Sequence, residues 1–401
     1  MSGTRHEGGL PLAAAAVYGA SLLQGLAMVS FPASGTFLKS RGFSDADYGL
    51  IFLPQLVTTI VGSLVGGGLA QRLGLGRLLA VALGATLLSQ AALASVAFLP
   101  GSPLPPVLIA TGLFGLGFGL AAAPLNTVPG LLFPQRGAAA VVALHTVLGG
   151  GLALGPVLAA RFIEGGRWSA FPGLLMGLSA LLATLALVAP IPARAESSAT
   201  TGTVPEESPL RSVGVWIFAA MVVLYAFAEG TFANWSVIYL SEERGLALDR
   251  AQSALSAFWA AMSIGRLLVA ALLLRMPAGP IWLAFPVLML AAFVGVSRTG
   301  TPGGAIALFA FAGLACSAFF PVTMGLATRR FAADAPLVSS LMIAALMTGV
   351  GIGSFVIGPL RASLRLADLY LYSAAYPAGA LALALLLVGR GDVRLREKAQ
   401  A

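Results

Sequence analysis

The chain has 401 residues, of which 23 are Lys or Arg and 15 are Asp or Glu, so that 9% are charged, and its mean hydropathy is +0.93. Ordinary soluble domains carry about a quarter charged residues, so these values exclude a soluble fold and predict a polytopic membrane protein. The net charge of +8 does not indicate a nucleic-acid partner, because the basic residues are scattered singly between apolar runs. With one cysteine and two histidines, no cofactor or metal site is expected.

Apolar runs long enough to cross a bilayer follow one another along the chain. A helix needs roughly 20 apolar residues to span the hydrocarbon core. One long run divides in two because the segment from Pro100 to Pro106 breaks it. We therefore predict twelve spans: Gly8–Leu38, Tyr48–Gln71, two within Leu78–Gln135, Gly137–Ala160, Trp168–Ala193, Ser212–Ser241, Ala251–Leu274, Met276–Ser297, Thr299–Thr328, Ala335–Leu360 and Leu369–Gly389.

Basic residues near the span ends predict the orientation. Cytoplasmic loops of membrane proteins are enriched in Lys and Arg. Placing both termini and the even-numbered connections in the cytoplasm puts the larger share of basic residues there, among them Arg72, Arg77, Arg329 and Arg330. We therefore expect both termini in the cytoplasm. The first run is too long for a signal peptide and is expected to remain as a helix.

One polar stretch separates two halves of six spans. Residues 194–211 are rich in Ser, Thr, Glu and Pro and are typical of a flexible linker. The domains expected on either side are an N-terminal bundle over 1–193 and a C-terminal bundle with a short cytoplasmic tail over 212–401.

The two halves also repeat each other. A shift of 203 residues aligns identical residues at four places: Arg41-Gly42 with Arg244-Gly245, Gly62 with Gly265, Arg72 with Arg275, and Gly155-Pro156 with Gly358-Pro359. The predicted fold is an all-α membrane protein of twelve helices in two pseudo-symmetric six-helix bundles. Many secondary transporters have this architecture, with the substrate site near the bilayer midplane.

A short motif after the second span carries a family resemblance. Residues 67–79 resemble the loop between helices two and three of the major facilitator superfamily, with Gln71 in place of the usual Asp. The resemblance covers nearly the whole chain and implies the twelve-helix fold of that superfamily and transport by alternating access. It also implies that a gate loop is formed by Gly67, Gln71, Arg72, Gly74 and Arg77.

Two further segments are similar to the fucose and glucose:proton symporter branch of that superfamily. The first runs from Asn126 to Pro156 and includes His145, and the second runs from Ala228 to Leu240 and includes Glu229. This similarity implies proton-coupled uptake of a sugar. Gly151, Gly155 and Pro156 also partly match a motif of drug antiporters, so that proton-coupled efflux of amphipathic compounds is an alternative.

Glu229 is the only carboxylate predicted inside a span. It lies roughly 16 Å from the outer end of its span, and Arg266 lies roughly 13 Å from the inner end of the next one, so the two are near one depth in a bilayer about 30 Å thick. Ionisable residues at that depth are candidates for function by default. We predict that Glu229 carries the coupling proton and that Arg266 tunes it. A fixed structural ion pair is the alternative.

Asn126 and His145 are placed at one depth by a similar argument. They lie at equal distances from the turn Phe133–Gly137, so on antiparallel helices they should be level, roughly 12 to 15 Å into the membrane. Neutral His and Asn offer donors and acceptors without net charge, which suits a hydroxyl-rich ligand. An interhelical hydrogen bond is the alternative. His145 is also a candidate for proton coupling, because His titrates near neutral pH.

Other polar and aromatic residues of the spans are candidates for lining the binding site. Amides and aromatic faces suit a carbohydrate in a concave site. The predicted substrate-binding residues, besides Asn126, are Gln24, Gln55, Tyr225, Phe232, Asn234, Trp235 and Trp259. Trp168, Trp216 and Trp282 lie near span ends and are expected to anchor the interfacial belt.

These patterns predict an inner-membrane secondary transporter with proton symport of a small neutral solute, and the resemblance implies that this solute is a sugar such as a hexose. The alternatives are efflux of amphipathic compounds and transport of an organic anion with Arg266 as the counter-charge. No nucleophile and base share a depth, so an enzyme is not expected. No phosphate-binding loop indicates ATP drive, and the proton gradient is the expected driving force. The expected partners are the solute and the lipid bilayer, with the chain acting as a monomer.

Overall fold

The computed structural model describes residues 9–191 and 209–393. These two ranges are helical and contain no β-strand. Twelve helical segments are long and apolar enough to cross a membrane, which confirms the predicted number of spans. The chain divides into an N-terminal unit that ends at Ala199 and a C-terminal unit that begins at Thr200. Most of the predicted linker, 194–211, and most of the predicted tail lie outside the described residues.

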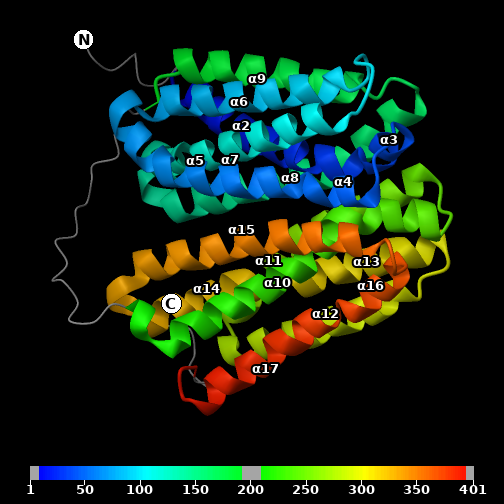
Figure 1. Cartoon of the computed structure of the whole chain (residues 1–401). Coiled ribbons are helices and arrows are strands. Elements are labelled where there is room, and N and C mark those ends of the chain that lie inside the picture. Colours follow the sequence, from blue (N-terminus) through cyan, green and yellow to red (C-terminus); the bar gives the residue numbers. More distant parts are fainter. Residues whose placement is uncertain (1–8, 192–208, 394–401) are drawn as a thin grey trace, which may run out of the picture. The chain divides into compact units, whose positions relative to one another are not determined.

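The N-terminal unit contains six spans, and its long helices run alongside one another (Figure 1). Its helices are α2 (Gly9–Ala33), α3 (Gly35–Ser40), α4 (Asp45–Leu50), α5 (Phe52–Leu73), α6 (Leu75–Ser95), α7 (Leu104–Leu132), η1 (Pro134–Arg136), α8 (Gly137–Glu164) and α9 (Ala170–Val188).

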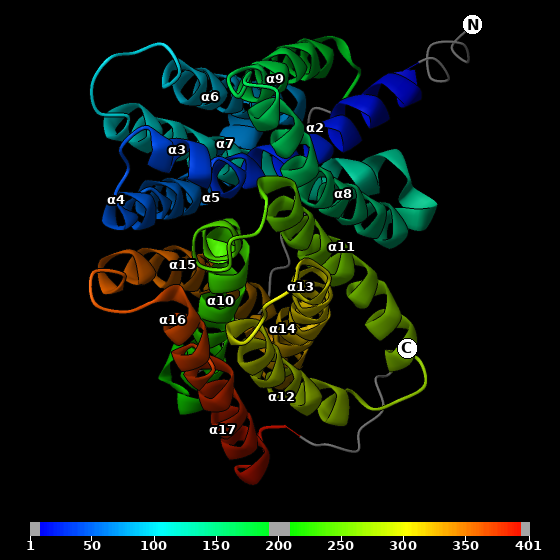
Figure 2. The same ribbon diagram turned by 90° about the vertical axis from the view of Figure 1, so that its right-hand side faces the viewer.

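The C-terminal unit contains the other six spans, seen from another side in Figure 2. Its elements are η2 (Pro209–Arg211), α10 (Val213–Ile238), the π-helical turn η3 (Tyr239–Glu243), α11 (Leu248–Leu273), α12 (Ala278–Ser297), α13 (Pro302–Cys316), α14 (Phe319–Arg330), η4 (Ala332–Asp334), α15 (Ala335–Leu360), α16 (Leu366–Tyr372) and α17 (Ala375–Gly389).

The two units repeat one packing scheme. In the N-terminal unit α2 packs on α8, α5 on α7 and α6 on α9, and in the C-terminal unit α10 packs on α15, α11 on α13 and α12 on α17. The repeat-related Gly42 and Gly245 both have positive φ, +97° and +64°, and each lies between the first and second spans of its unit. These are conformations that glycine adopts at little cost. The structure therefore agrees with the repeat that the sequence indicates.

Small residues bring the paired helices into backbone contact. A Cβ atom on Gly151 of α8 would lie 2.2 Å from the carbonyl oxygen of Leu22 on α2. A Cβ on Gly313 of α13 would lie 2.0 Å from the carbonyl oxygen of Phe258 on α11. Such contacts exclude any side chain, so these glycines serve close helix packing.

The segment resembling a gate loop is mostly helical. Gly67, Gln71 and Arg72 belong to the last two turns of α5, and Arg77 belongs to the first turn of α6. Only Gly74 separates the two helices, with φ of +83°. The loop expected over 67–79 is therefore corrected to a one-residue turn. Gln71, Arg72 and Arg77 are exposed.

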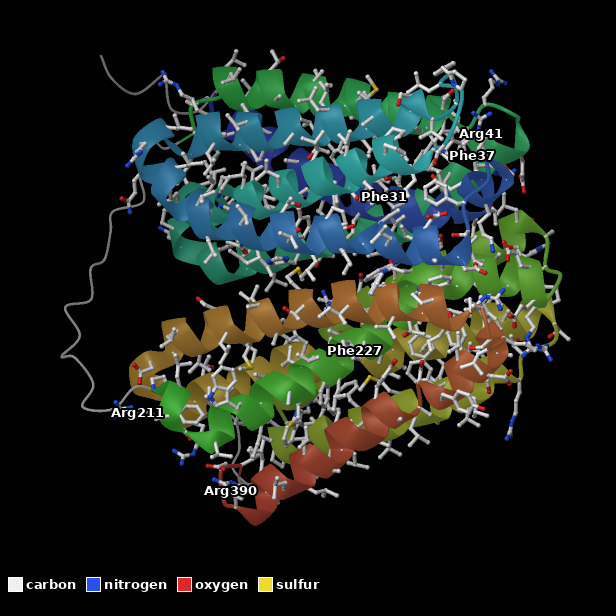
Figure 3. The ribbon with its side chains drawn as sticks, viewed as in Figure 1. Phe31, Phe37, Arg41, Arg211, Phe227 and Arg390 are labelled. Atoms are coloured by element: carbon white, nitrogen blue, oxygen red, sulfur yellow. The ribbon has the colours of Figure 1, made fainter. Side chains whose placement is uncertain are left out.

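Both chain ends of the C-terminal unit lie at one end of its bundle. Figure 3 labels Arg211, just before α10, and Arg390, just after α17, at that same end (Figure 3). Asp392 accepts hydrogen bonds there from Arg330 at 2.9 Å and from Arg390 at 3.1 Å. This arrangement follows from an even number of spans in the unit.

Candidate functional site

The tenth span is interrupted, whereas the sequence predicts a continuous helix there. The segment Thr299–Thr328 was expected to be one helix, but within the observed span Pro302–Arg330 helix α13 ends at Cys316 and α14 begins at Phe319. Pro321 explains the break. It has no N–H to bond the carbonyl of Ser317, four residues earlier, and its ring clashes with that carbonyl in a continuous helix. Pro321 lies instead in the first turn of α14, where proline is tolerated.

Side chains of the neighbouring helices bind the carbonyl groups at this break. The hydroxyl of Tyr225, on α10, donates to the carbonyl oxygen of Cys316 at 3.0 Å. The guanidinium of Arg266, on α11, donates from Nε to the carbonyl oxygen of Ser317 at 3.1 Å. Buried carbonyl groups without partners are costly, so these two contacts stabilise the broken helix inside the bundle.

Glu229 lies beside this broken helix. It is one turn beyond Tyr225 on α10, partly buried, and close to the Tyr225 hydroxyl. Figure 3 labels Phe227, two residues earlier, about midway along α10, so Glu229 lies in the middle of its span. The Tyr225 hydroxyl donates to Cys316, and its oxygen can also accept a hydrogen bond. A protonated Glu229 carboxyl could donate to it.

Arg266 is near Glu229 but is not paired with it. The guanidinium lies within electrostatic range of the carboxyl. In the described part of the chain, however, no nitrogen of Arg266 lies within 4.0 Å of a carboxylate oxygen of Glu229. Its hydrogen bonds go to Ser317 and, at 3.4 Å from Nη2, to the sulfur of Met262. The fixed ion pair that the sequence left open is therefore not the arrangement in this structure.

Asn126 and His145 meet in the N-terminal unit. His145 Nε2, on α8, is 3.2 Å from Asn126 Oδ1, on α7, which confirms that the two residues are level. Asn126 Nδ2 donates to the carbonyl oxygen of Ala122 at 2.8 Å. Since this bond fixes the amide orientation, Oδ1 accepts from His145 and Nε2 carries the proton. Both side chains are exposed. An exposed polar pair within a span avoids acyl chains, so this face meets water or polar groups.

The other amide candidates have varied surroundings. Gln24, on α2, is buried at 4% exposure, and Gln55, on α5, is partly buried. Asn234, on α10, donates from Nδ2 to the hydroxyl of Ser354, on α15, at 2.7 Å. The binding roles of Gln24 and Gln55 therefore stay predictions. Asn234 joins α10 to α15 through its hydrogen bond.

Two aromatic candidates are in the helix packing rather than on a cavity wall. Phe232 is fully buried and stacks on Phe293, with ring centroids 4.1 Å apart. Trp235 is also fully buried and donates from Nε1 to the carbonyl oxygen of Ser354 at 3.0 Å. These placements correct the lining role expected for Phe232 and Trp235. Tyr225 is likewise buried, so its contribution is the contact with the broken helix.

Trp259 differs from the other aromatic candidates. It is 4% exposed, packs edge-on against Phe258, and its indole Nε1 is a buried donor without a hydrogen-bond partner within the described residues. Buried indole N–H groups normally have a partner. A solute or a water molecule at this position would satisfy it, which keeps Trp259 as a binding candidate.

The expected belt of tryptophans is also corrected. Trp168 is buried, stacks on Phe37 and donates to the hydroxyl of Ser34 at 2.9 Å. Trp282 is fully buried and donates to the hydroxyl of Thr323 at 2.8 Å. Both therefore join helices within their units, because neighbouring hydroxyls satisfy their N–H groups. Trp216 is 52% exposed and fits the expected place at the interface.

The backbone of the broken helix is a candidate element of the site that the sequence did not predict. The available signal was Pro321 in the middle of a predicted span, together with an arginine in a neighbouring span that needs an acceptor. No group of three His, Cys, Asp or Glu side chains that could hold a metal ion is present among the described residues.

Comparison with known proteins agrees with this architecture. The model of the Major Facilitator Superfamily matches residues 14–305, and the chain therefore belongs to that family. It is a membrane transporter rather than an enzyme. The comparison with curated proteins found no match.

Solved structures show the same fold. A mutant of the nucleoside transporter NupG superposes with a TM-score of 0.76 at 14% identity, covering 94% of this chain and 99% of that one. A D-xylose-proton symporter superposes with a TM-score of 0.72 at 17% identity, covering 97% of this chain and 98% of that one. At such identities the likeness concerns the fold alone.

Proposed function

We propose that this transporter is a proton-coupled symporter of a small neutral solute such as a sugar, and that Glu229 carries the proton. The observation that carries the proposal is the position of Glu229. It is an acid in the middle of a span, beside an arginine that is bound elsewhere. A carboxyl without a fixed counter-ion can exist in both protonation states, whereas a tight ion pair would hold it charged.

Hydrogen-bonding groups found within each unit support a hydroxyl-rich solute. The His145–Asn126 pair is exposed and neutral when His145 carries a single proton, and Trp259 offers a buried indole N–H. Such groups bind hydroxyls without requiring a charge on the solute. The similar structures transport xylose with protons in one case and nucleosides in the other, by their names, and both solutes carry sugar hydroxyls.

Transport by alternating access between the two units, in the inner membrane and with both termini in the cytoplasm, is part of the proposal. The repeated packing scheme supports it, since two similar bundles are the usual basis of such a cycle.

An organic anion is a second candidate solute. Arg266 is exposed within its span, and its hydrogen bonds use Nε and Nη2, so that the rest of the guanidinium is available to a carboxylate. For such a solute, Arg266→Gln would abolish binding, whereas for a neutral sugar it would leave binding within a few-fold of wild type.

Reconstituted vesicles test the proposal. A panel of labelled hexoses, pentoses, nucleosides and monocarboxylates would be offered with and without an inward proton gradient. We expect saturable accumulation of a neutral sugar that the gradient drives. The Glu229→Gln variant should lose this accumulation but retain exchange of labelled for unlabelled solute. Accumulation by Glu229→Gln equal to wild type would exclude the proton role, and accumulation driven by an opposite gradient would indicate efflux.

A further inference from the structure

The arginine beside Glu229 is held by a backbone group that exists because of one proline. The carbonyl of Ser317 cannot bond an N–H four residues ahead, because that residue is Pro321. It accepts the Nε–H of Arg266 at 3.1 Å instead. Gly265, next to Arg266, permits the approach, since a Cβ there would lie 2.5 Å from the Ser317 hydroxyl oxygen.

We propose that Pro321 is a positioning residue of the proton-coupling site, because the acceptor it leaves at Ser317 holds Arg266 beside Glu229 without an ion pair. The inference deepens the proposed function and rests on Glu229 being the proton carrier. When Glu229 loses its proton, Arg266 can exchange the Ser317 carbonyl for the carboxylate. The broken helix then loses one of the two side chains that bind its carbonyls, and α14 is free to move relative to α13.

The charged and titratable groups around Glu229 are few. Tyr225 is on the same helix, Arg266 comes from α11, and Cys316 comes from α13. Of the other elements packed on α10, α15 and α17 carry no charged side chain, α14 carries Arg329 and Arg330 only in its last turn, and η3 carries Glu242 and Glu243 beyond the end of α10. Tyr376 of α17 is titratable but packs on Phe227. Arg266 is therefore the one permanent charge near the carboxyl among the described residues, and its position governs the protonation of Glu229.

Three variants test this role of Arg266: one moves its charge toward Glu229, one removes the charge, and the third combines the two changes. Pro321→Ala restores an N–H for the Ser317 carbonyl, so that Arg266 loses its acceptor and moves onto the Glu229 carboxylate. Arg266→Gln removes the charge. The combined variant has no charge to release, so it should behave as Arg266→Gln alone, a non-additivity expected of residues acting through one contact.

Infrared spectroscopy of the purified full-length protein measures this without any solute. The C=O band of protonated Glu229 is assigned by its loss in Glu229→Gln, and its intensity is followed from acid to alkaline pH. We expect the midpoint in Pro321→Ala to fall by about one pH unit or more, because an approaching opposite charge favours the carboxylate. The midpoint in Arg266→Gln should rise, and the combined variant should match Arg266→Gln.

A matched control separates positioning from helix structure. Pro286 lies inside α12 of the same unit, and Pro286→Ala likewise restores a backbone N–H. It should leave the midpoint where wild type has it. Pro321→Ser restores the same N–H and serves if Pro321→Ala does not fold. Equal midpoints for wild type, Pro321→Ala and Pro321→Ser would overturn the proposal. A midpoint in the combined variant below that of Arg266→Gln alone would also overturn it.

The two proposals fail separately. If Glu229→Gln vesicles accumulate solute as wild type does, the proposed function fails whatever the infrared titration gives. If that accumulation is lost while the Pro321 variants titrate as wild type does, only the positioning role of Pro321 is overturned.

Discussion

The fourth span of each unit occupies the same place in the repeat, yet only one of the two is broken. Helix α7 packs on α5 and α6, as α13 packs on α11 and α12. Helix α7 continues through two prolines, Pro124 and Pro129, whereas the tenth span is interrupted four residues before Pro321.

Side chains from neighbouring helices distinguish the two spans. Near the prolines of α7, Asn126 binds a carbonyl of its own helix. In the tenth span, Tyr225 and Arg266 come from two other helices to bind the carbonyls of Cys316 and Ser317. A proline thus weakens a helix, but the backbone opens where other side chains can satisfy it. The opening lies beside the acid that we propose as the proton carrier.

The largest effect is expected at the glycine contacts that hold these spans in place. In Gly313→Ala the new Cβ would lie 2.0 Å from the Phe258 carbonyl oxygen, and in Gly115→Ala 2.3 Å from that of Gln55. Both oxygens belong to backbone, so the helices must separate, at a cost of about 3 kcal/mol. Thermal unfolding in detergent should show a clear loss in both. Gly303→Ala, where no atom lies within 4 Å, should unfold like wild type. Unchanged unfolding of Gly313→Ala would contradict the described packing.

A smaller effect isolates the contribution of Tyr225 to the broken span, with a tyrosine that bonds the unbroken helix α8 of the other unit as the comparison. Tyr225→Phe leaves the Cys316 carbonyl without its donor at a fully buried site and should cost about 1–2 kcal/mol. Tyr18→Phe removes a similar bond, to the Ala140 carbonyl at 2.9 Å, at a partly buried site that water can reach, and should cost less. The same unfolding measurement compares them. An equal or larger cost for Tyr18→Phe would show that the broken span gains nothing special from Tyr225.

The smallest effect on stability is expected at the exposed pair of the N-terminal unit. His145→Ala and Asn126→Ala should change the unfolding free energy by less than about 0.5 kcal/mol. Each should weaken solute binding, and the double variant should be no weaker than either single one, because they share one hydrogen bond of 3.2 Å. Binding isotherms for the transported solute check this. If both single variants bind the solute with wild-type affinity, the pair serves only as an interhelical contact.

Length and hydropathy were enough to predict the twelve spans, because a helix must cover the hydrocarbon core whatever its partners are. The level positions of Asn126 and His145 followed from counting residues on either side of one turn, and the structure confirms them. The break before Pro321 could not be predicted in this way. An apolar run containing a proline has the same length whether it is continuous or interrupted, and the side chains that permit the interruption come from distant parts of the chain.

The wall position expected of Phe232 was wrong for a different reason. Its spacing from Glu229 gives a shared stripe along α10, but a helix with so few polar residues has no continuous polar face to show which stripe meets a cavity. Once the helices are packed, the rings of Phe258, Phe293, Phe309 and Tyr370 contact Phe232, and the ring of Tyr239 packs on Tyr370. Such contacts depend on helix rotation, which periodicity in an apolar span does not determine.

Proton movement driven by the solute itself is the most direct test of Glu229 as the carrier. Vesicles containing the protein and a trapped pH-sensitive dye, without an imposed gradient, would receive an inward gradient of a solute that the wild type accumulates. The account predicts that the lumen acidifies in step with uptake for wild type and that Glu229→Gln takes up solute with no acidification. Acidification by Glu229→Gln at the wild-type rate would contradict it.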